Sequence, residues 1–292
     1  MRIAVAGDVH GHLALLYAIL GRWQRESGST IDLILQVGDL GAFAPGSRVD
    51  RATRWHAERD PEELEFGLFA GPDPPAAPMD PRPPLVFIPG NHEDFDYLDE
   101  CESRVPKADA LYPVSADRRI LALKSGRIWT FEARGRRLRI AGVSGVAGRE
   151  SRPGRHPRLH LREDDVMRVL ERGPGSVDVF LSHEGPLGIW GGDRVARGSP
   201  ALGVLIEELQ PPLAFFGHYD RVGEWRIGRT RLYALAGCGY DQGGVWPVKR
   251  GGIAVMEWDG PDARVDRLRD RWLAEANRTT WRSWSRQGPQ TS

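Results

Sequence analysis

The stretch "RIAVAGDVHG", residues 2–11, places an apolar run directly before a polar turn. Short apolar runs bounded by glycine or proline are typical of strands, and continuous apolarity predicts a strand that is buried on both faces. The turn offers Asp8 and His10, whose side chains can either bind a metal ion or face water. A single ending of this kind is weak evidence for a site.

The same arrangement recurs four more times along the chain. Each apolar run ends at a polar block, and four of the eight histidines lie in the five blocks. The further runs are residues 31–37, 85–89, 177–181 and 213–216, followed by Gly38-Asp39, Gly90-Asn91-His92-Glu93, Ser182-His183-Glu184 and Gly217-His218-Tyr219-Asp220. Because the carboxyl ends of strands form the ligand crevice of α/β sheets, we expect the blocks to meet in one polar cluster.

The remaining elements complete an α/β pattern. Strands without polar endings are expected at residues 138–143, 231–237 and 252–258. Helices are expected at residues 13–26, 163–172 and 199–210. In the last of these, Ser199 is the expected N-cap, Pro200 the first helical residue, and Pro211 follows the end of the helix.

Composition is that of an ordinary globular protein. The 292 residues include 40 basic and 40 acidic side chains, so charge gives no global preference for nucleic acid or membranes. Cys101 and Cys238 show no metal-like or redox-like spacing, which fits a reducing compartment. Without an apolar leader or an apolar run of about 20 residues, we expect a cytoplasmic protein with no membrane partner.

The residue types in the five blocks suit hydrolysis at a metal centre. Imidazole nitrogens with carboxylate and amide oxygens bind Mn, Fe or Zn, and one aspartate can bridge two cations. Two metals about 3.5–4 Å apart can clamp a phosphoryl oxygen and lower the pKa of a bound water to about 7. The resulting hydroxide is a nucleophile for in-line attack on phosphorus, which predicts a phosphoester hydrolase.

Taken in order, "GDVHG", "GDLG", "GNHE", "SHEGP" and "GHYD" resemble the five signature blocks of the calcineurin-like metallophosphoesterase superfamily. The resemblance implies an α/β fold, a four-layer β-sandwich flanked by helices. It implies two divalent metal ions, with Mn²⁺ expected and Fe²⁺, Zn²⁺ or Mg²⁺ as alternatives. The implied ligands are Asp8 and His10 at the first ion, Asp39 as the bridge, and Asn91, His183 and His218 at the second ion. His92 is the implied proton donor to the leaving oxygen, and Asp39 with the metals positions the hydroxide.

Three longer stretches resemble RNA lariat debranching enzymes, phosphodiesterases of the same superfamily that open 2′-5′ linkages. They are "IAGVSGVAG" (140–148), "VDVFLSHEGP" (177–186) and "GSPALGVLIEELQPPLAFFGH" (198–218), within a similarity that covers most of residues 1–245. Two departures are expected to matter. Debranching enzymes carry cysteine in place of Asp8, and we expect no counterpart of their large C-terminal region.

The last block also departs from the superfamily pattern, which has His-x-His where this chain has His218 and Asp220. We expect Asp220 to complete the first metal site. Apart from His10 that site would then have only oxygen ligands, which favours Mn²⁺ or Mg²⁺. The alternative is that Asp220 pairs with a neighbour such as Arg221, and the first metal is weakly held or absent.

Substrate contacts are expected from two regions. His12 either touches substrate or is an exposed residue at a helix start. Arg149, Arg152 and Arg155 lie in a basic loop at about 144–165, where debranching enzymes carry their RNA-recognition loop. The wider stretch 118–158 holds twelve lysines and arginines but two acids, and is either a phosphate-binding surface or a solvated hairpin.

Several other features carry alternatives. Glu93 or Asp94 either orients His92 or caps the following helix, while His56, His156 and His160 are expected at the surface. One catalytic domain is expected over residues 1–260, with a proline-rich surface excursion at 72–84 and a C-terminal helical extension or tail at 261–292. The segment 272–286, rich in tryptophan and arginine, either docks its apolar face or stacks on nucleic acid.

The expected function is therefore a phosphodiesterase whose substrate is a nucleotide or RNA-type phosphoester, attacked by a metal-bridging hydroxide. A phosphomonoesterase and a non-catalytic scaffold of the same fold are the alternatives. The second block continues as "GDLGAFAP" and lacks the Asp-Arg-Gly continuation typical of protein phosphatases.

Overall fold

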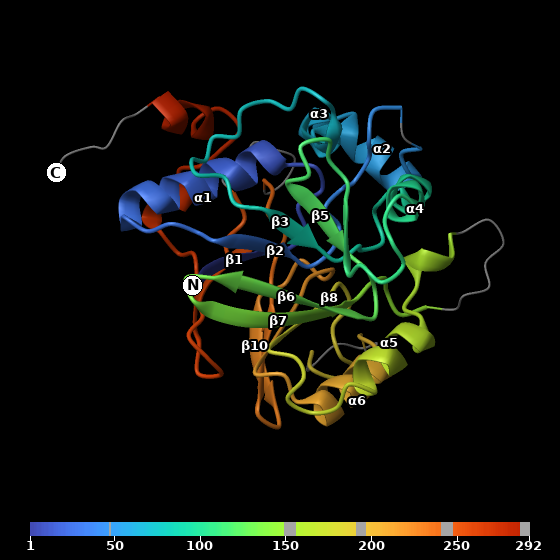
Figure 1. Cartoon of the computed structure of the whole chain (residues 1–292). Coiled ribbons are helices and arrows are strands. Elements are labelled where there is room, and N and C mark those ends of the chain that lie inside the picture. The colour runs from blue at the N-terminus through green and yellow to red at the C-terminus, as the bar shows by residue number, and fades with distance from the viewer. Residues whose placement is uncertain (47, 149–155, 191–196, 241–247, 287–292) are drawn as a thin grey trace.

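The computed structural model describes residues 1–46, 48–148, 156–190, 197–240 and 248–286. Two mixed β-sheets pack face to face (Figure 1). The first runs, in spatial order, β13 (Arg264–Arg267), β12 (Ile253–Glu257), β1 (Arg2–Ala6), β2 (Leu33–Gln36), β3 (Leu85–Phe87), β5 (Ile120–Leu123) and β4 (Leu111–Pro113). The second runs β10 (Gly223–Ile227), β11 (Thr230–Ala234), β9 (Leu213–Phe216), β8 (Val179–Ser182), β7 (Arg136–Val143) and β6 (Arg127–Ala133).

Helices cover the outer face of each sheet. Helix α1 (Leu13–Ser27) lies on the first sheet, and α5 (Glu163–Leu170) and α6 (Pro200–Leu209) lie on the second (Figure 1). Shorter elements in the connections are α2 (Arg51–Ala57), η1 (Pro61–Leu64), α3 (Phe66–Ala70), α4 (Phe95–Ser103) and η2 (Pro157–Leu159). None of the helices in the described part of the chain is long and apolar enough to span a bilayer. The order helix, sheet, sheet, helix confirms the predicted four-layer sandwich.

Strand β1 shows why its sequence is apolar throughout. Successive side chains of a strand point to opposite faces. Ile3 and Val5 therefore join the core between the two sheets, whereas Ala4 and Ala6 join the core beneath α1. A third core lies between the second sheet and the pair α5 and α6. The strand is thus buried on both faces, as the sequence predicts. Because both cores hold β1 in place, they also fix the position of the polar block that follows it.

Helix α6 forms as its sequence predicts. The Ser199 side chain accepts a hydrogen bond from the Leu202 N–H, and Pro200 occupies the first turn. The helix ends at Gln210, which adopts a left-handed conformation with φ of 52°. These caps set the start of β9 and hence the position of the last polar block.

The first sheet continues past residue 260, the expected end of the catalytic domain. Strand β13 pairs antiparallel with β12, so the first sheet includes residues 264–267. The segment that follows forms short 3-10 turns, η4 (Arg271–Ala274) and η5 (Trp281–Arg286), in place of a regular helix. Its docking is apolar, because Trp272, Trp281 and Trp284 are buried in the core beneath α1. The Asn277 side chain accepts N–H groups from the next residues and so interrupts the helical path.

The proline-rich segment 72–84 contains no helix or strand, as predicted, but it is not a free surface excursion. Met79 is buried in the core. The Pro78 carbonyl approaches α1 so closely that a Cβ on Gly21 would lie 2.3 Å from it. Glycine at position 21 thus allows the segment to pack against α1.

Candidate metal centre

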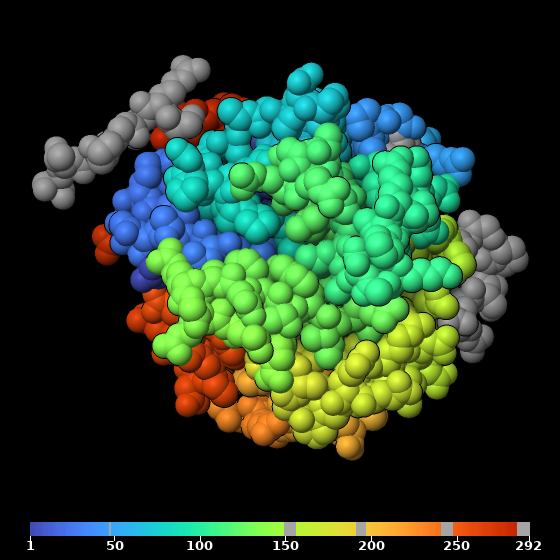
Figure 2. Space-filling model, viewed as in Figure 1, coloured from blue at the N-terminus to red at the C-terminus, as the bar shows by residue number. Residues whose placement is uncertain are grey.

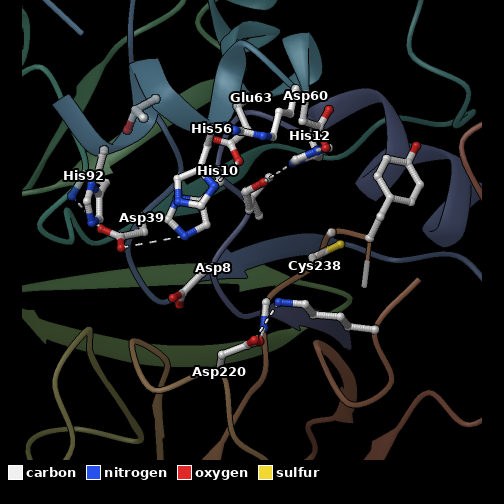
Figure 3. A pocket seen from close by; sticks show the side chains of 18 of the residues that line it. Asp8, His10, His12, Asp39, His56, Asp60, Glu63, His92, Asp220 and Cys238 are labelled. Atoms are coloured by element: carbon white, nitrogen blue, oxygen red, sulfur yellow. Dashed lines mark hydrogen bonds and ion pairs between the residues drawn. The ribbon is translucent and has the colours of Figure 1, made fainter. Parts of the chain in front are cut away.

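The five polar blocks lie together where β1, β2 and β3 of one sheet and β8 and β9 of the other reach their carboxyl ends. Backbone hydrogen bonds hold the blocks to one another. The Val9 and His10 N–H groups both donate to the Asp39 carbonyl at 2.9 Å, and the Gly217 N–H donates to the His183 carbonyl at 3.2 Å. The blocks thus form one cluster, part of which is shown in Figure 3.

Asp39 lies at the centre of this cluster. Its Oδ1 accepts the backbone N–H groups of Asn91 at 2.6 Å and His92 at 2.7 Å. Its Oδ2 lies 3.2 Å from Nε2 of His183 and 4.0 Å from Nε2 of His10. One carboxylate oxygen is therefore fixed by the third block, while the other faces imidazoles from two different blocks. This is the placement that a bridging carboxylate requires.

Two groups of donors share Asp39. Asp8, His10 and Asp39 form one group, and Asp39, His183 and His218 form the other, with the donor atoms of each group within 4.8 Å of one another. Oδ1 of Asn91 lies 3.1 Å from Nε2 of His183, beside the second group. Histidine and carboxylate donors without thiolates suit Mn, Fe or Zn, so these residues fit two divalent ions bridged by Asp39.

The backbone is unusual at the same residues. His10, Asp39, His218 and Asp220 have φ values of 43°, 53°, 69° and 50°. Non-glycine residues rarely adopt this left-handed region, and such strain persists where the surrounding structure imposes it, often at functional sites. Close packing adds to this constraint, since a Cβ on Gly90 would lie 2.2 Å from Oδ1 of Asp39.

Burial and charge set the protonation of the cluster. Burial raises the pKa of Asp8 to about 7 and lowers the pKa of His10 and of His218 to about 4. Burial would also raise the pKa of Asp39, but the charge and hydrogen bond of His183 hold it below its usual range. Neutral His10 and His218 have a lone pair free for a cation. Burial disfavours the charged ring of His183, but the Asp39 and Asp8 carboxylates raise its pKa to about 10, so His183 must release a proton when a cation binds and compensates those carboxylates.

His92 is supported from behind by Asp50. Nδ1 of His92 lies 3.1 Å from Oδ2 of Asp50, and the His92 ring centroid lies 5.7 Å from that of His10. Burial disfavours the charged ring, but the Asp50 hydrogen bond and the Asp39 and Asp50 carboxylates raise the pKa of His92 to about 9. His92 therefore carries a proton at neutral pH.

Asp50 was not among the candidates that the sequence suggested for orienting His92. Asp94 instead caps α4 by accepting the Tyr97 N–H, and Glu93 accepts the N–H groups of Leu40 at 2.9 Å and Ala42 at 2.6 Å. The sequence does mark Asp50 as an N-cap, because it precedes α2 and accepts the N–H groups of that first turn. Its second partner, His92, arises only from tertiary packing.

Asp220 lies in the same cavity as Asp8 and His10 but outside both donor groups. Its Oδ1 accepts the Gly237 N–H at 2.9 Å, and its Oδ2 lies 2.5 Å from Nζ of Lys249. The alternative to metal binding was a partner near in sequence, such as Arg221. The observed partner is Lys249, which lies 29 residues further along the chain.

His12 lies at the start of α1 but is not exposed there, although it lines the same cavity as Asp8 and His10. It is buried, and its ring nitrogens lie 3.0 Å from the Val9 carbonyl and 3.1 Å from Oδ2 of Asp60. His160 is also buried, contrary to expectation, whereas His56 is exposed as expected. Both buried histidines lie in polar stretches of sequence, which predict exposure. Their burial results from contacts with other parts of the chain, which local sequence does not predict.

The basic stretch 118–158 is only partly described. Arg149, Arg152 and Arg155 lie outside the described residues. Residues 127–143 form the β6–β7 hairpin, where Arg134 pairs with Asp32 at 2.8 Å and Arg139 with Asp178 at 2.7 Å. These two arginines are thus engaged by carboxylates of the protein itself.

A cavity of about 640 Å³ opens over the first donor group. Asp8, His10, Asp39 and His92 line its inner end. Figure 3 shows these side chains around the cavity, with Asp220 near Asp8 and with His12 and Asp60 to one side. The cavity is large enough for a phosphoester with its substituents, and His92 faces it together with Asp8, His10, Asp39 and His218.

Comparisons with known proteins agree with this geometry. Residues 1–220 match the family model described as calcineurin-like phosphoesterase. The lariat debranching enzyme of Arabidopsis thaliana is 26% identical over 247 residues, covering 75% of this chain and 54% of that one. The enzyme of the same name from Schizosaccharomyces pombe is 28% identical over 245 residues, covering 72% and 46%. This chain spans about half the length of these relatives.

A solved structure shows the same fold. The protein TT1561 of Thermus thermophilus aligns with a TM-score of 0.52 at 16% identity, covering 92% of this chain and 99% of that one. The resemblance inferred from the five blocks is confirmed, and the family model includes all of them. The chain belongs to the calcineurin-like phosphoesterase family, whose members are metal-dependent phosphoric ester hydrolases.

Proposed function

We propose that this chain is a phosphodiesterase that hydrolyses a nucleotide or RNA-type phosphodiester. The observation that carries the proposal is the placement of the His92 imidazole beside two donor groups that share Asp39. When water attacks the phosphorus of a diester, the bond to one ester oxygen breaks, and the departing alkoxide needs a proton. His92 is positioned to supply it, with Asp50 holding the other ring nitrogen.

The donor groups would hold two divalent ions, which we propose to be Mn²⁺. When bound, such a pair supplies an activated water and neutralises charge on the phosphoryl oxygens. Asp8 and His10 would hold one ion, and Asn91, His183 and His218 the other, with Asp39 shared by both. The backbone N–H groups of Asn91 and His92 fix Asp39 and so set the distance between the acid and the metal centre.

The choice of a diester rests on the relatives. The matched proteins are named lariat debranching enzymes, and the matches extend over about three quarters of this chain. The second block, which lacks the Asp-Arg-Gly continuation, gives no support to a protein phosphatase. The pairing of Asp220 with Lys249 is the one observation that favours the alternative of a scaffold with an incomplete site.

Rates on bis(p-nitrophenyl) phosphate and p-nitrophenyl phosphate, measured with Mn²⁺, test the proposal. We expect the diester to be hydrolysed faster. On a dinucleotide, whose leaving group is an alkoxide, we expect His92→Ala to abolish turnover while the metal content stays that of the wild type. A faster rate on the monoester would identify a phosphomonoesterase. Failure of the wild type to turn over either ester, with metals bound, would identify a scaffold.

A further inference from the structure

A groove leads away from the metal centre on the side of His92. A cavity of about 1190 Å³ is lined at one end by Asn91, His92 and His218, and at the other end by His156 and Pro157. A third cavity, of about 950 Å³, begins at the same His156 and Pro157. His156 and Pro157 are therefore a wall common to both cavities, which places the third cavity beside the one that reaches the metal centre.

The third cavity lies between α4 and α5. Its walls come from the end of α4, the turn between β5 and β6, and the first part of α5. We call it the α4–α5 groove (lining residues within 99–107, 124–127 and 156–168, and Ser144). Figure 2 shows the teal surface of the α4 region directly above the yellow-green surface of the α5 region, on the right side of the molecule.

The α4–α5 groove carries an excess of positive charge. Six lysines and arginines line it against three acids. All three acids are paired within the wall: Asp99 and Glu102 with Arg158, at 2.5 and 3.1 Å, and Asp165 with Arg168 at 2.5 Å. Among the described residues, the remaining cations have no carboxylate partner: Lys107, Lys124, Arg127 and Arg162.

Lys124 is the most informative of these cations. It is only 6% exposed, and its Nζ donates to one acceptor in the described chain, the Pro106 carbonyl at 2.9 Å. An ammonium group has three N–H donors, and burial of a cation without an anion is costly. Arg127 lies beside it and donates to the Lys107 carbonyl at 3.4 Å. The wall thus presents a largely buried lysine, with the partly exposed Arg127 beside it, to an anion that the described chain itself does not supply.

We propose that the α4–α5 groove binds backbone phosphates of a single-stranded polynucleotide whose scissile phosphate lies at the metal centre. This rests on the proposed function and specifies its substrate as a chain that extends well beyond one nucleotide. Lysine and arginine contacts to phosphates position a strand without reading its bases. The groove therefore contributes affinity and register, with little dependence on sequence.

Fluorescence anisotropy with a labelled oligouridylate of about ten nucleotides, carrying phosphorothioate linkages to slow cleavage, measures this contact with the Mn²⁺-loaded protein. The test variant combines Lys107→Ala, Arg127→Ala and Arg162→Ala. The matched control combines Arg136→Ala, Arg172→Ala and Arg226→Ala, which remove the same charge from exposed positions outside the groove. An oligothymidylate of the same length distinguishes a DNA strand from an RNA strand.

We expect the groove variant to bind the strand at least about tenfold more weakly and its salt dependence to fall by about 2 in log–log slope, since each phosphate contact to a single strand contributes about 0.7. The control should bind within about twofold of the wild type. Equal weakening in both variants would overturn the proposal, as would a wild type that binds the long strand no better than a dinucleotide. If the groove variant loses affinity for only one of the two oligonucleotides, the result supports strand binding in the groove and identifies the strand as RNA or DNA.

Hydrolysis of bis(p-nitrophenyl) phosphate separates this proposal from the proposed function. This small diester fits within the cavity at the metal centre, so all three proteins should turn it over at the same rate. If none of them hydrolyses it, the proposed function fails. The binding comparison would still show whether the groove binds a polynucleotide strand. A rate lost only in the groove variant would show that its substitutions damage the metal centre, and would count against a role in strand binding.

Discussion

Asp50 and His92 are 42 residues apart in the chain, yet Oδ2 of Asp50 lies 3.1 Å from Nδ1 of His92. The same carboxylate caps α2, because its Oδ1 accepts the N–H groups of Ala52 and Thr53. The start of a helix therefore fixes the ring that faces the metal centre. A carboxylate behind an imidazole orients the ring and stabilises its protonated form, as in other acid–base pairs.

Substitution Asp50→Asn tests this relationship. Asparagine still caps a helix, so α2 should form, but the charge that favours protonated His92 is lost. We expect kcat on a phosphodiester to fall about 10- to 100-fold, as is common for residues that orient a catalytic group. Metal content, measured by elemental analysis, should not change. Asp94→Asn is the matched control, since Asp94 caps α4. Equal losses in both variants would assign Asp50 a purely structural role.

Removal of metal should destabilise the fold. Asp8, Asp39 and His183 are buried together, and only the native chain brings these donors into one place. A ligand that binds the native state alone stabilises it by about 2.7 kcal/mol at one hundred times its Kd. We expect Mn²⁺ to raise Tm by about 5 °C or more over the protein in a chelator. Differential scanning fluorimetry measures this, and identical melting with and without Mn²⁺ would show that the donor groups bind no ion.

Glu93 should matter for stability rather than for chemistry. It is buried, with Oε1 2.9 Å from the Leu40 N and Oε2 2.6 Å from the Ala42 N, so each oxygen accepts a different N–H of the second block. Glutamine would place an NH₂ group against one of these donors. A buried polar group without a partner costs about 1–3 kcal/mol, which is the expected loss in unfolding free energy for Glu93→Gln. Urea unfolding checks this against Glu26→Gln, an exposed site, and an unchanged midpoint for Glu93→Gln would contradict it.

The sequence predicts the elements that position the site because their signals are local. The apolar run of β1 predicts both its burial and the place where Asp8 and His10 begin. Ser199 and Pro200 predict the start of α6 through capping chemistry that involves only neighbouring residues. The meeting of the five blocks then follows from the rule that strand ends form the ligand crevice.

The sequence does not predict the contacts that close the site from a distance. Lys249 reaches Asp220 from the far side of the β11–β12 connection, and Asp50 reaches His92 from the start of α2. Burial of His12 depends on Asp60, 48 residues away, and no local pattern marks that pair. Tertiary packing determines such partners. Hydrophobic periodicity and helix caps predict only the local structure of the residues that form them.

The pairing of Asp220 with Lys249 leads to the last prediction. An ion bound at Asp8 and His10 would have to share Asp220 with the Lys249 ammonium, which lies 2.5 Å from its Oδ2. A positive charge close to a cation site weakens binding of the cation, and a carboxylate that is already paired offers less to a metal.

If Asp220 is a ligand, Lys249→Met should tighten binding of the weaker ion, because it frees the carboxylate and removes a competing charge. Asp220→Ala should lower the content from two Mn²⁺ per chain toward one. Elemental analysis gives the stoichiometry and calorimetric titration gives the affinity of each ion, with Lys107→Met as a control far from the site. Two ions of unchanged affinity in every variant would place Asp220 outside the metal centre, whereas a single ion in the wild type that Lys249→Met raises to two would show that Lys249 occupies the place of the second cation.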